Sequence, residues 1–173
     1  MEPTMRTIQK KVCLLGDFAV GKTSLVRRFI EGRFDDKYLS TIGVKISRKP
    51  MKRADHVLNL LIWDLAGGDD YSKMGNHYLR GAVGALIVCD LTRPDTLEAL
   101  GFYTKQLRDI NENAAIVFIG NKVDLEDARQ INDEQLKTIA AKKQVPFLLT
   151  SAKTGVSVAD AFDLLATQLE ALL

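Results

Sequence analysis

A glycine-framed loop near the N-terminus constrains the fold of this chain more than any other segment. The apolar run Val12–Leu15 leads directly into Gly16–Thr23, and a helical pattern follows. Two glycines let the backbone curl so that successive N–H groups face a phosphate, a lysine adds a point charge, and a threonine hydroxyl can hold Mg²⁺. An ordinary surface turn is the alternative, which the preceding apolar strand disfavours. The sequence therefore predicts a P-loop that binds a nucleoside triphosphate through Asp17, Phe18, Ala19, Val20, Gly21, Lys22, Thr23 and Ser24.

The composition is typical of one folded domain. The chain has 173 residues, of which 46% are hydrophobic, so we expect a single domain over residues 1–173. Its net charge is only +2, with both signs interspersed, and a broad basic face for nucleic acid is not expected. No apolar run approaches the roughly 18 residues of a membrane span, and the N-terminus lacks the apolar segment of a signal peptide. We therefore expect a cytoplasmic protein.

The cysteines and the C-terminal residues are also consistent with a cytoplasmic protein. Cys13 and Cys89 lie inside apolar runs, where free thiols behave as small core hydrophobes. Residues 168–173 carry no cysteine, so we expect no prenyl anchor on this sequence. Any membrane contact is expected to be peripheral and made through a partner, or through sequence outside this chain.

Apolar runs alternate with longer segments of helical periodicity. This alternation predicts βαβ units around a parallel sheet. The continuous hydrophobicity of Ala82–Cys89 favours a central strand covered on both faces. The expected strands lie at Val12–Leu15, Val57–Trp63, Val83–Cys89, Ile116–Gly120 and Pro146–Leu149.

Three helices have clear boundaries in the sequence. Pro94 opens one that runs to about Asn111, and a capping box at Asn132–Gln135 opens another. Ser157 precedes the third, whose apolar residues recur at helical spacing. We expect these residues to face the core: Val158, Ala161, Phe162, Leu165, Leu169 and Leu172.

A basic hairpin is expected before Val57–Trp63. Its first arm is Lys45–Lys49, and Lys52 and Arg53 form a basic tip after Pro50. A solvated turn is the simpler interpretation of the tip. Binding of an acidic lipid or an acidic partner is the alternative.

Polar motifs follow three of the later strands. Asp64–Gly67 comes after the strand that ends at Trp63, where an aspartate can hold Mg²⁺ and the Gly67 N–H can meet a γ-phosphate. Asn121, Lys122 and Asp124 follow the buried strand Ile116–Gly120, and the Asp124 carboxylate can accept two hydrogen bonds from guanine that adenine does not offer. After the last strand, backbone groups are positioned to meet the base from its other side, in Ser151, Ala152 and Lys153.

These four motifs, in this order, resemble those of the Ras-like small GTPases over nearly the whole chain. Thr41–Val44, Ile62–Asp64 and Tyr78–Ala82 are most similar to the Rab branch, although Ile46 stands where that branch has an aromatic residue. The resemblance implies an α/β fold, the P-loop NTPase G domain. Its six-stranded, mostly parallel sheet has one antiparallel strand and is flanked by five helices. It also implies GTP and GDP as ligands and Mg²⁺ as cofactor.

The same resemblance assigns roles to further residues. Thr41 would reach Mg²⁺ and the γ-phosphate in the GTP state, and the metal ligands would be Thr23, Thr41 and Asp64. Phe34 would stack against the guanine, and Tyr38 would cover the phosphates. Switch I, residues 34–46, and switch II, residues 64–80, would bind an effector, with an exchange factor and an activating protein as further partners.

Two residues depart from the family pattern at the catalytic centre, for which we expect Lys22, Thr41, Gly67, Gly68 and Asp69. Gly68 replaces the glutamine that normally orients the attacking water, and Phe18 stands where the family has a small residue. Hydrolysis is therefore expected to be slow, unless Asp69 or Asp70 orients the water. A GTP-locked scaffold that does not cycle is one alternative function. A P-loop ATPase or kinase is another, which Asn121 and Asp124 disfavour.

Overall fold

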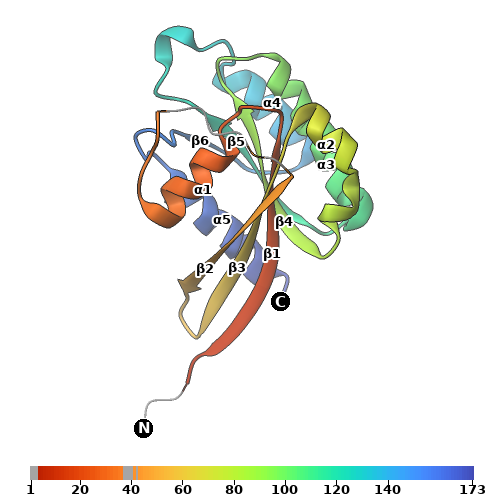
Figure 1. Cartoon of the computed structure of the whole chain (residues 1–173), viewed down its shortest axis with the longest axis vertical. Coiled ribbons are helices and arrows are strands. Elements are labelled where there is room, and N and C mark those ends of the chain that lie inside the picture. The colour runs from red at the N-terminus through yellow and green to blue at the C-terminus, as the bar shows by residue number, and fades with distance from the viewer. Residues whose placement is uncertain (1–3, 37–40, 42) are drawn as a thin grey trace.

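A twisted sheet runs through the centre of the molecule (Figure 1). The computed structural model describes residues 4–36, 41 and 43–173. In these residues the sheet has six strands in the order β2-β3-β1-β4-β5-β6, and only β2 runs antiparallel to its neighbour. The predicted sheet is confirmed, with strands β1 Arg6–Gly16, β2 Val44–Lys52, β3 His56–Leu65, β4 Ala82–Asp90, β5 Ala115–Asn121 and β6 Phe147–Thr150.

Five α-helices cover the two faces of this sheet in the described part of the chain, as predicted. The capping box of α4 is confirmed, because the Asn132 side chain accepts from the Gln135 N–H and the Gln135 side chain accepts from the Asn132 N–H, each at 2.8 Å. The described residues also form two short 3₁₀ helices, η1 Asn76–Leu79 and η2 Glu126–Ala128. The helices are α1 Lys22–Glu31, α2 Gly68–Met74, α3 Asp95–Ile110, α4 Asp133–Lys143 and α5 Val158–Ala171.

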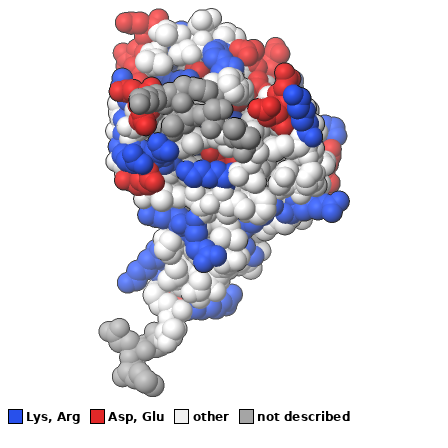
Figure 2. Space-filling model, viewed as in Figure 1, with Lys and Arg blue, Asp and Glu red and all other residues white. Residues whose placement is uncertain are grey.

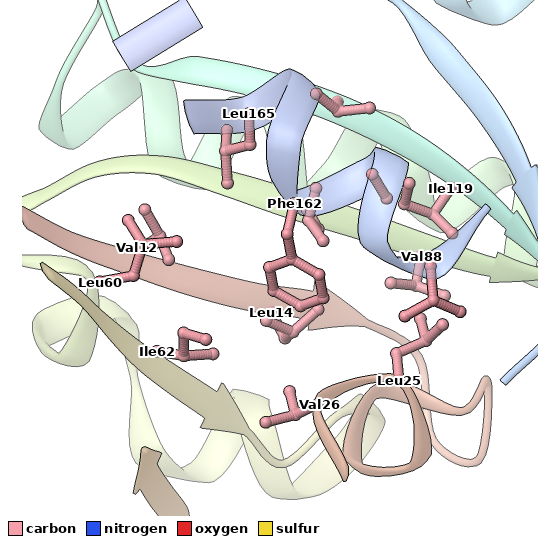
Figure 3. Close-up of a cluster of buried hydrophobic side chains, with 14 of the residues drawn as sticks. Val12, Leu14, Leu25, Val26, Leu60, Ile62, Val88, Ile119, Phe162 and Leu165 are labelled. Carbon is pink, nitrogen blue, oxygen red and sulfur yellow. The ribbon is translucent and has the colours of Figure 1, made fainter. Parts of the chain in front are cut away.

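Neighbouring residues of a central strand pack into different layers. Along β1, Val12 and Leu14 join a cluster with α1 and α5, whereas Cys13 and Leu15 join one with α2, α3 and α4. Figure 3 shows the first cluster, with Phe162 of α5 lying over β1. Burial on both faces explains why the central strands have continuous rather than alternating hydrophobicity. The buried position of both cysteines is confirmed.

Two details of the sequence prediction are wrong. Leu172 is 58% exposed, because α5 ends at Ala171 and the helical spacing does not continue to this residue. The basic hairpin itself is confirmed as β2 and β3, but Arg53 at its tip is not solvated. Only 17% of its side chain is exposed, since it is paired with Asp163 and Glu170 of α5.

The carboxyl ends of the parallel strands meet at one edge of the sheet. The register pairs Gly16 with Val88, Asp90 with Asn121, and Asn121 with Thr150. Ligands of open α/β sheets bind outside this edge. The motifs that follow β1, β3, β5 and β6 therefore come together there, at the end of the sheet away from the β2–β3 turn (Figure 1).

The face of the opposite, narrow end that Figure 2 shows is mainly basic. Figure 2 shows mostly Lys and Arg on this end and both signs of charge on the wide end. Exposed Lys45, Arg48 and Lys52 lie on β2, the edge strand of the sheet. Within the described residues, no helix is long and apolar enough to cross a membrane.

Candidate functional site

A cavity of about 350 Å³ opens at the carboxyl edge of the sheet. Its walls come from the P-loop, the start of α1, the segment between α1 and β2, the end of β3, and the segments after β3, β5 and β6. Five lining residues were not predicted: Asp35, Asp36, Leu65, Ala66 and Leu125. The predicted residues that line it are Phe18, Ala19, Gly21, Lys22, Thr23, Ser24, Phe34, Thr41, Gly67, Asn121, Lys122, Asp124, Ala152 and Lys153.

The other predicted residues lie around or outside this cavity. Val20 and Ser151 are fully buried behind its wall, and Asp64 is buried beside Thr23. Asp17 lines a second hollow next to the first, together with Asp69. Tyr38 is outside the described residues.

Side chains hold the carbonyls of the P-loop one by one. Lys22 Nζ donates to the carbonyls of Gly16 and Asp17 at 2.8 and 2.9 Å, and Asn121 Nδ2 donates to the carbonyl of Val20 at 3.0 Å. Arg93 donates to the carbonyl of Phe18, and Lys122 donates to that of Ala19. Because a peptide group is planar, a fixed carbonyl also fixes the direction of the next N–H. The loop is thereby held in one conformation through Gly16, Asp17, Phe18, Ala19 and Val20.

Lys22 is a buried cation in a site lined by polar groups. Only 6% of the residue is exposed, and burial lowers the pKa of its ammonium group to about 8. The carboxylates of Asp64 and Asp17 act in the opposite direction. A phosphate in the cavity would supply the negative charge that a buried ammonium needs.

Three side-chain oxygens converge at the end of β3. Thr23 Oγ1 donates to Asp64 Oδ2 at 2.5 Å and also contacts Thr41 Oγ1, which lies 3.5 Å from the same carboxylate oxygen. Asp64 Oδ1 is buried without a hydrogen-bond partner among the described residues, and burial raises the pKa of this carboxyl group. A cation would compensate both features. The all-oxygen donor set with one carboxylate fits Mg²⁺, which usually keeps phosphate and water as its other ligands.

The end of the cavity formed by β5 and β6 is held rigidly. Asn121 Oδ1 accepts from Thr150 Oγ1 at 3.0 Å, and Asp124 Oδ1 accepts from Ser151 Oγ at 2.7 Å. The Ser151 hydroxyl orients the Asp124 carboxylate. The expected contact of the Ser151 backbone with the base stays a prediction. A Cβ on Gly21 would lie 2.2 Å from Asn121 Nδ2, so only glycine fits at this point of the P-loop.

The two unusual residues at the catalytic centre lie side by side. A Cβ built on Gly68 would be 3.5 Å from the Phe18 Cβ. Gly68 has a φ of +61°, and its N–H donates to the Tyr103 hydroxyl at 3.1 Å. The neighbouring Gly67 is pressed against the P-loop, because a Cβ there would meet the Gly16 carbonyl oxygen at 2.3 Å.

Aromatic side chains connect α2 to α3 next to Gly68. Tyr71 packs edge-on against Tyr103, with ring centroids 5.0 Å apart, and also against Phe102. Tyr103 is buried, and burial raises the pKa of its hydroxyl to about 12. Sequence reasoning did not identify Tyr103 or Arg93, because their contacts join segments far apart in the chain.

Known proteins of one family match this chain over most of its length. The sequence model of the Ras family matches residues 11–171. The chain belongs to the Ras family. It is 39% identical to Ras-related protein RABA1h of Arabidopsis thaliana, over 92% of this chain and 73% of that protein. It is 38% identical to Ras-related protein Rab11B of Nicotiana tabacum, over 92% and 74% of the two chains.

The predicted Ras-like family and its Rab-like character are therefore confirmed. This Ras-family protein is a small GTP-binding protein of the Rab type. Members of the family are GTPases that bind GTP or GDP with Mg²⁺, and they act together with effectors, exchange factors and activating proteins.

Proposed function

We propose that residues 1–173 form a single G domain that works as a GTP/GDP switch and hydrolyses GTP slowly. The observation that carries the proposal is the cavity itself, in which the P-loop, the oxygen cluster and Asp124 surround one space. Asp124 selects guanine, because its carboxylate accepts from the ring N–H and the amino group. The Ser151 hydroxyl fixes that carboxylate before the base arrives.

The switching step rests on Thr41 and Gly67. Thr41 belongs to switch I, and its hydroxyl contacts that of Thr23 in the oxygen cluster. Gly67 belongs to switch II and lies against the P-loop. With Thr23 and Asp64, Thr41 would hold Mg²⁺, whose charge would offset that of the phosphates. A γ-phosphate would bind both segments at once, and its loss would release them.

Slow hydrolysis rests on the geometry of Gly68. It has no side chain to orient water, and its N–H is bound to Tyr103. Phe18 beside it is half exposed, and its ring would crowd an incoming arginine. An arginine finger in the presence of the water-orienting glutamine is worth about 10³–10⁵ in rate.

Single-turnover hydrolysis of bound GTP tests this proposal. We expect the wild-type protein to be slower than ordinary small GTPases. Gly68→Gln alone should raise the hydrolysis rate only slightly, because the φ of +61° at this position is unfavourable for a residue with a Cβ. The double variant Phe18→Gly with Gly68→Gln should give a larger gain. An ordinary rate in the wild-type protein would refute the proposal.

Asp69 is the proposed source of any residual activity. It lies in the first turn of α2 and lines the second hollow beside Gly68, as does Asp70. If Asp69 orients water, Asp69→Ala should abolish the residual rate while leaving GDP affinity unchanged. A residual rate that survives in both Asp69→Ala and Asp70→Ala would remove these carboxylates from the mechanism.

A GTP-locked scaffold is the second candidate, favoured by the same missing side chain at Gly68. Uniform GTP in the purified protein would support it, and a mixture of GTP and GDP would support cycling. In either case we propose that switch I, residues 34–46, and switch II, residues 64–80, bind an effector, with an exchange factor and an activating protein acting on the same switches. We place this activity in the cytoplasm, peripheral to a membrane through a partner. Equal affinity for ATP and GTP would instead point to a P-loop ATPase.

A further inference from the structure

The P-loop contains a residue in an unfavourable backbone conformation. Ala19 has a φ of +61°, in the left-handed region that residues with a Cβ seldom adopt. Ala19 also lines the cavity, so its N–H belongs to the part of the loop that faces a phosphate. Something outside the loop must hold the two peptide groups that flank this residue.

Two cationic side chains hold those peptide groups. Arg93 Nη1 donates to the Phe18 carbonyl at 2.7 Å, and Lys122 Nζ donates to the Ala19 carbonyl at 3.1 Å. Lys122 belongs to the guanine motif after β5. Arg93 comes from the turn between β4 and α3, which none of the nucleotide motifs includes.

One buried residue, Asp90, contacts both the side chain of Lys122 and the backbone of Arg93. Asp90, at the end of β4, is 1% exposed, and its Oδ2 pairs with Lys122 Nζ at 2.8 Å. Its Oδ1 accepts from the Thr92 N–H and hydroxyl at 2.9 and 2.7 Å, and its carbonyl accepts from the Arg93 N–H at 2.9 Å. Asp95, at the start of α3, lies 3.7 Å from the Arg93 guanidinium. The turn is thus shaped to deliver Arg93 to the P-loop.

We propose that Arg93 is a positioning residue of the phosphate site, which fixes the Phe18 carbonyl so that the Ala19 N–H is directed at the β-phosphate of the nucleotide. This inference rests on the proposed guanine-nucleotide site. The peptide between Phe18 and Ala19 is planar, so the hydrogen bond to its oxygen sets the direction of its N–H. The guanidinium also lies close enough to Lys22 to affect that ammonium group, so it adds positive potential where the phosphates would lie.

Competition binding of GDP, GTP and guanosine monophosphate to Arg93 variants tests the inference. Arg93→Ala should weaken GDP and GTP binding equally, by about tenfold, which is the effect of losing one charge-assisted hydrogen bond at a partly exposed side chain. Binding of guanosine monophosphate, which has no β-phosphate, should be unchanged. Arg93→Lys retains a cationic donor and should recover most of the loss. Lys105→Ala, on the exposed surface of α3, is the matched control.

The alternatives give different patterns. Unchanged GDP affinity in Arg93→Ala, or a loss confined to GTP, would overturn the inference, the second because it would indicate a γ-phosphate contact. An equal loss for guanosine monophosphate would also overturn it, because it would indicate general loosening of the site. Failure of the wild-type protein to bind GDP would instead refute the proposed guanine-nucleotide site, and the inference with it.

Discussion

Replacement of Arg53 by alanine should lower the free energy of unfolding without changing nucleotide binding. This side chain joins the β2–β3 turn to α5, at the end of the sheet away from the cavity (Figure 1). Its guanidinium binds both carboxylate oxygens of Glu170, reaches Asp163 at 2.5 Å, and donates to the Thr167 hydroxyl at 3.2 Å.

The magnitude follows from how exposed each partner is. Glu170 is 26% exposed and accepts from Arg53 through both carboxylate oxygens, so the Arg53–Glu170 pair should contribute about 1 kcal/mol to the free energy of unfolding. Asp163 is 59% exposed, and water screens that pair to about 0.4 kcal/mol. The bond to Thr167 should add about 0.5 kcal/mol. The sum of about 2 kcal/mol corresponds to a fall in Tm of roughly 4–8 °C for a chain of this size.

Urea and thermal denaturation would measure this change. All samples need the same GDP concentration, because bound nucleotide adds to the apparent stability. Lys52→Ala is the matched control, since Lys52 is the exposed cation next to Arg53 at the end of β2. A loss below about 0.5 kcal/mol, or one equal to that of the control, would show that solvent replaces these contacts and would refute the reasoning.

Two further predictions concern the nucleotide site. Asp124→Asn should weaken GDP binding by about 100-fold in titration calorimetry, because an amide cannot accept from both guanine donors; Asp127→Asn is the exposed control, and equal affinities would contradict the assignment. Burial lowers the pKa of Lys22 to about 8, so between pH 8 and 10 the nucleotide-free protein holds fewer protons than its unfolded or GDP-bound form. Its stability should therefore rise with pH over this window, and GDP binding at pH 9 should take up about one proton. Equal binding heats in buffers of different ionisation enthalpy would contradict that uptake.

Most of the fold was predictable from local pattern, because five of the six described strands contain an apolar run, whereas β2 was expected as one arm of a basic hairpin. Continuous apolar runs such as Ala82–Cys89 are needed by any strand covered on both faces, and the motifs after them fall at one edge by the geometry of parallel sheets. Only the part of the cavity lining that comes from the P-loop and the guanine motif was predictable from local spacing. Residues 16–24 and 121–124 are local segments whose spacing already determines which groups face the ligand.

Most features that the sequence did not predict involve contacts between distant segments. Arg53 was interpreted as solvated because charge near a turn usually is, yet its partners lie in α5, more than a hundred residues away. Arg93 likewise acts on Phe18, which belongs to a different part of the chain. Periodicity failed at Leu172, because a spacing rule cannot say where a helix stops. Pairings of this kind depend on tertiary structure rather than on local pattern.

Asn121 gives the binding site a property that neither of its halves has alone. Its amide joins the strand end next to the base to the P-loop at Val20, with no room even for a Cβ on Gly21 between them. A ligand that orders the base end of the site therefore also orders the P-loop. Guanosine and pyrophosphate, bound separately, would each bear the free-energy cost of ordering the whole site, whereas GDP bears it once. The binding free energy of GDP should thus exceed the sum for its two fragments, as in a chelate.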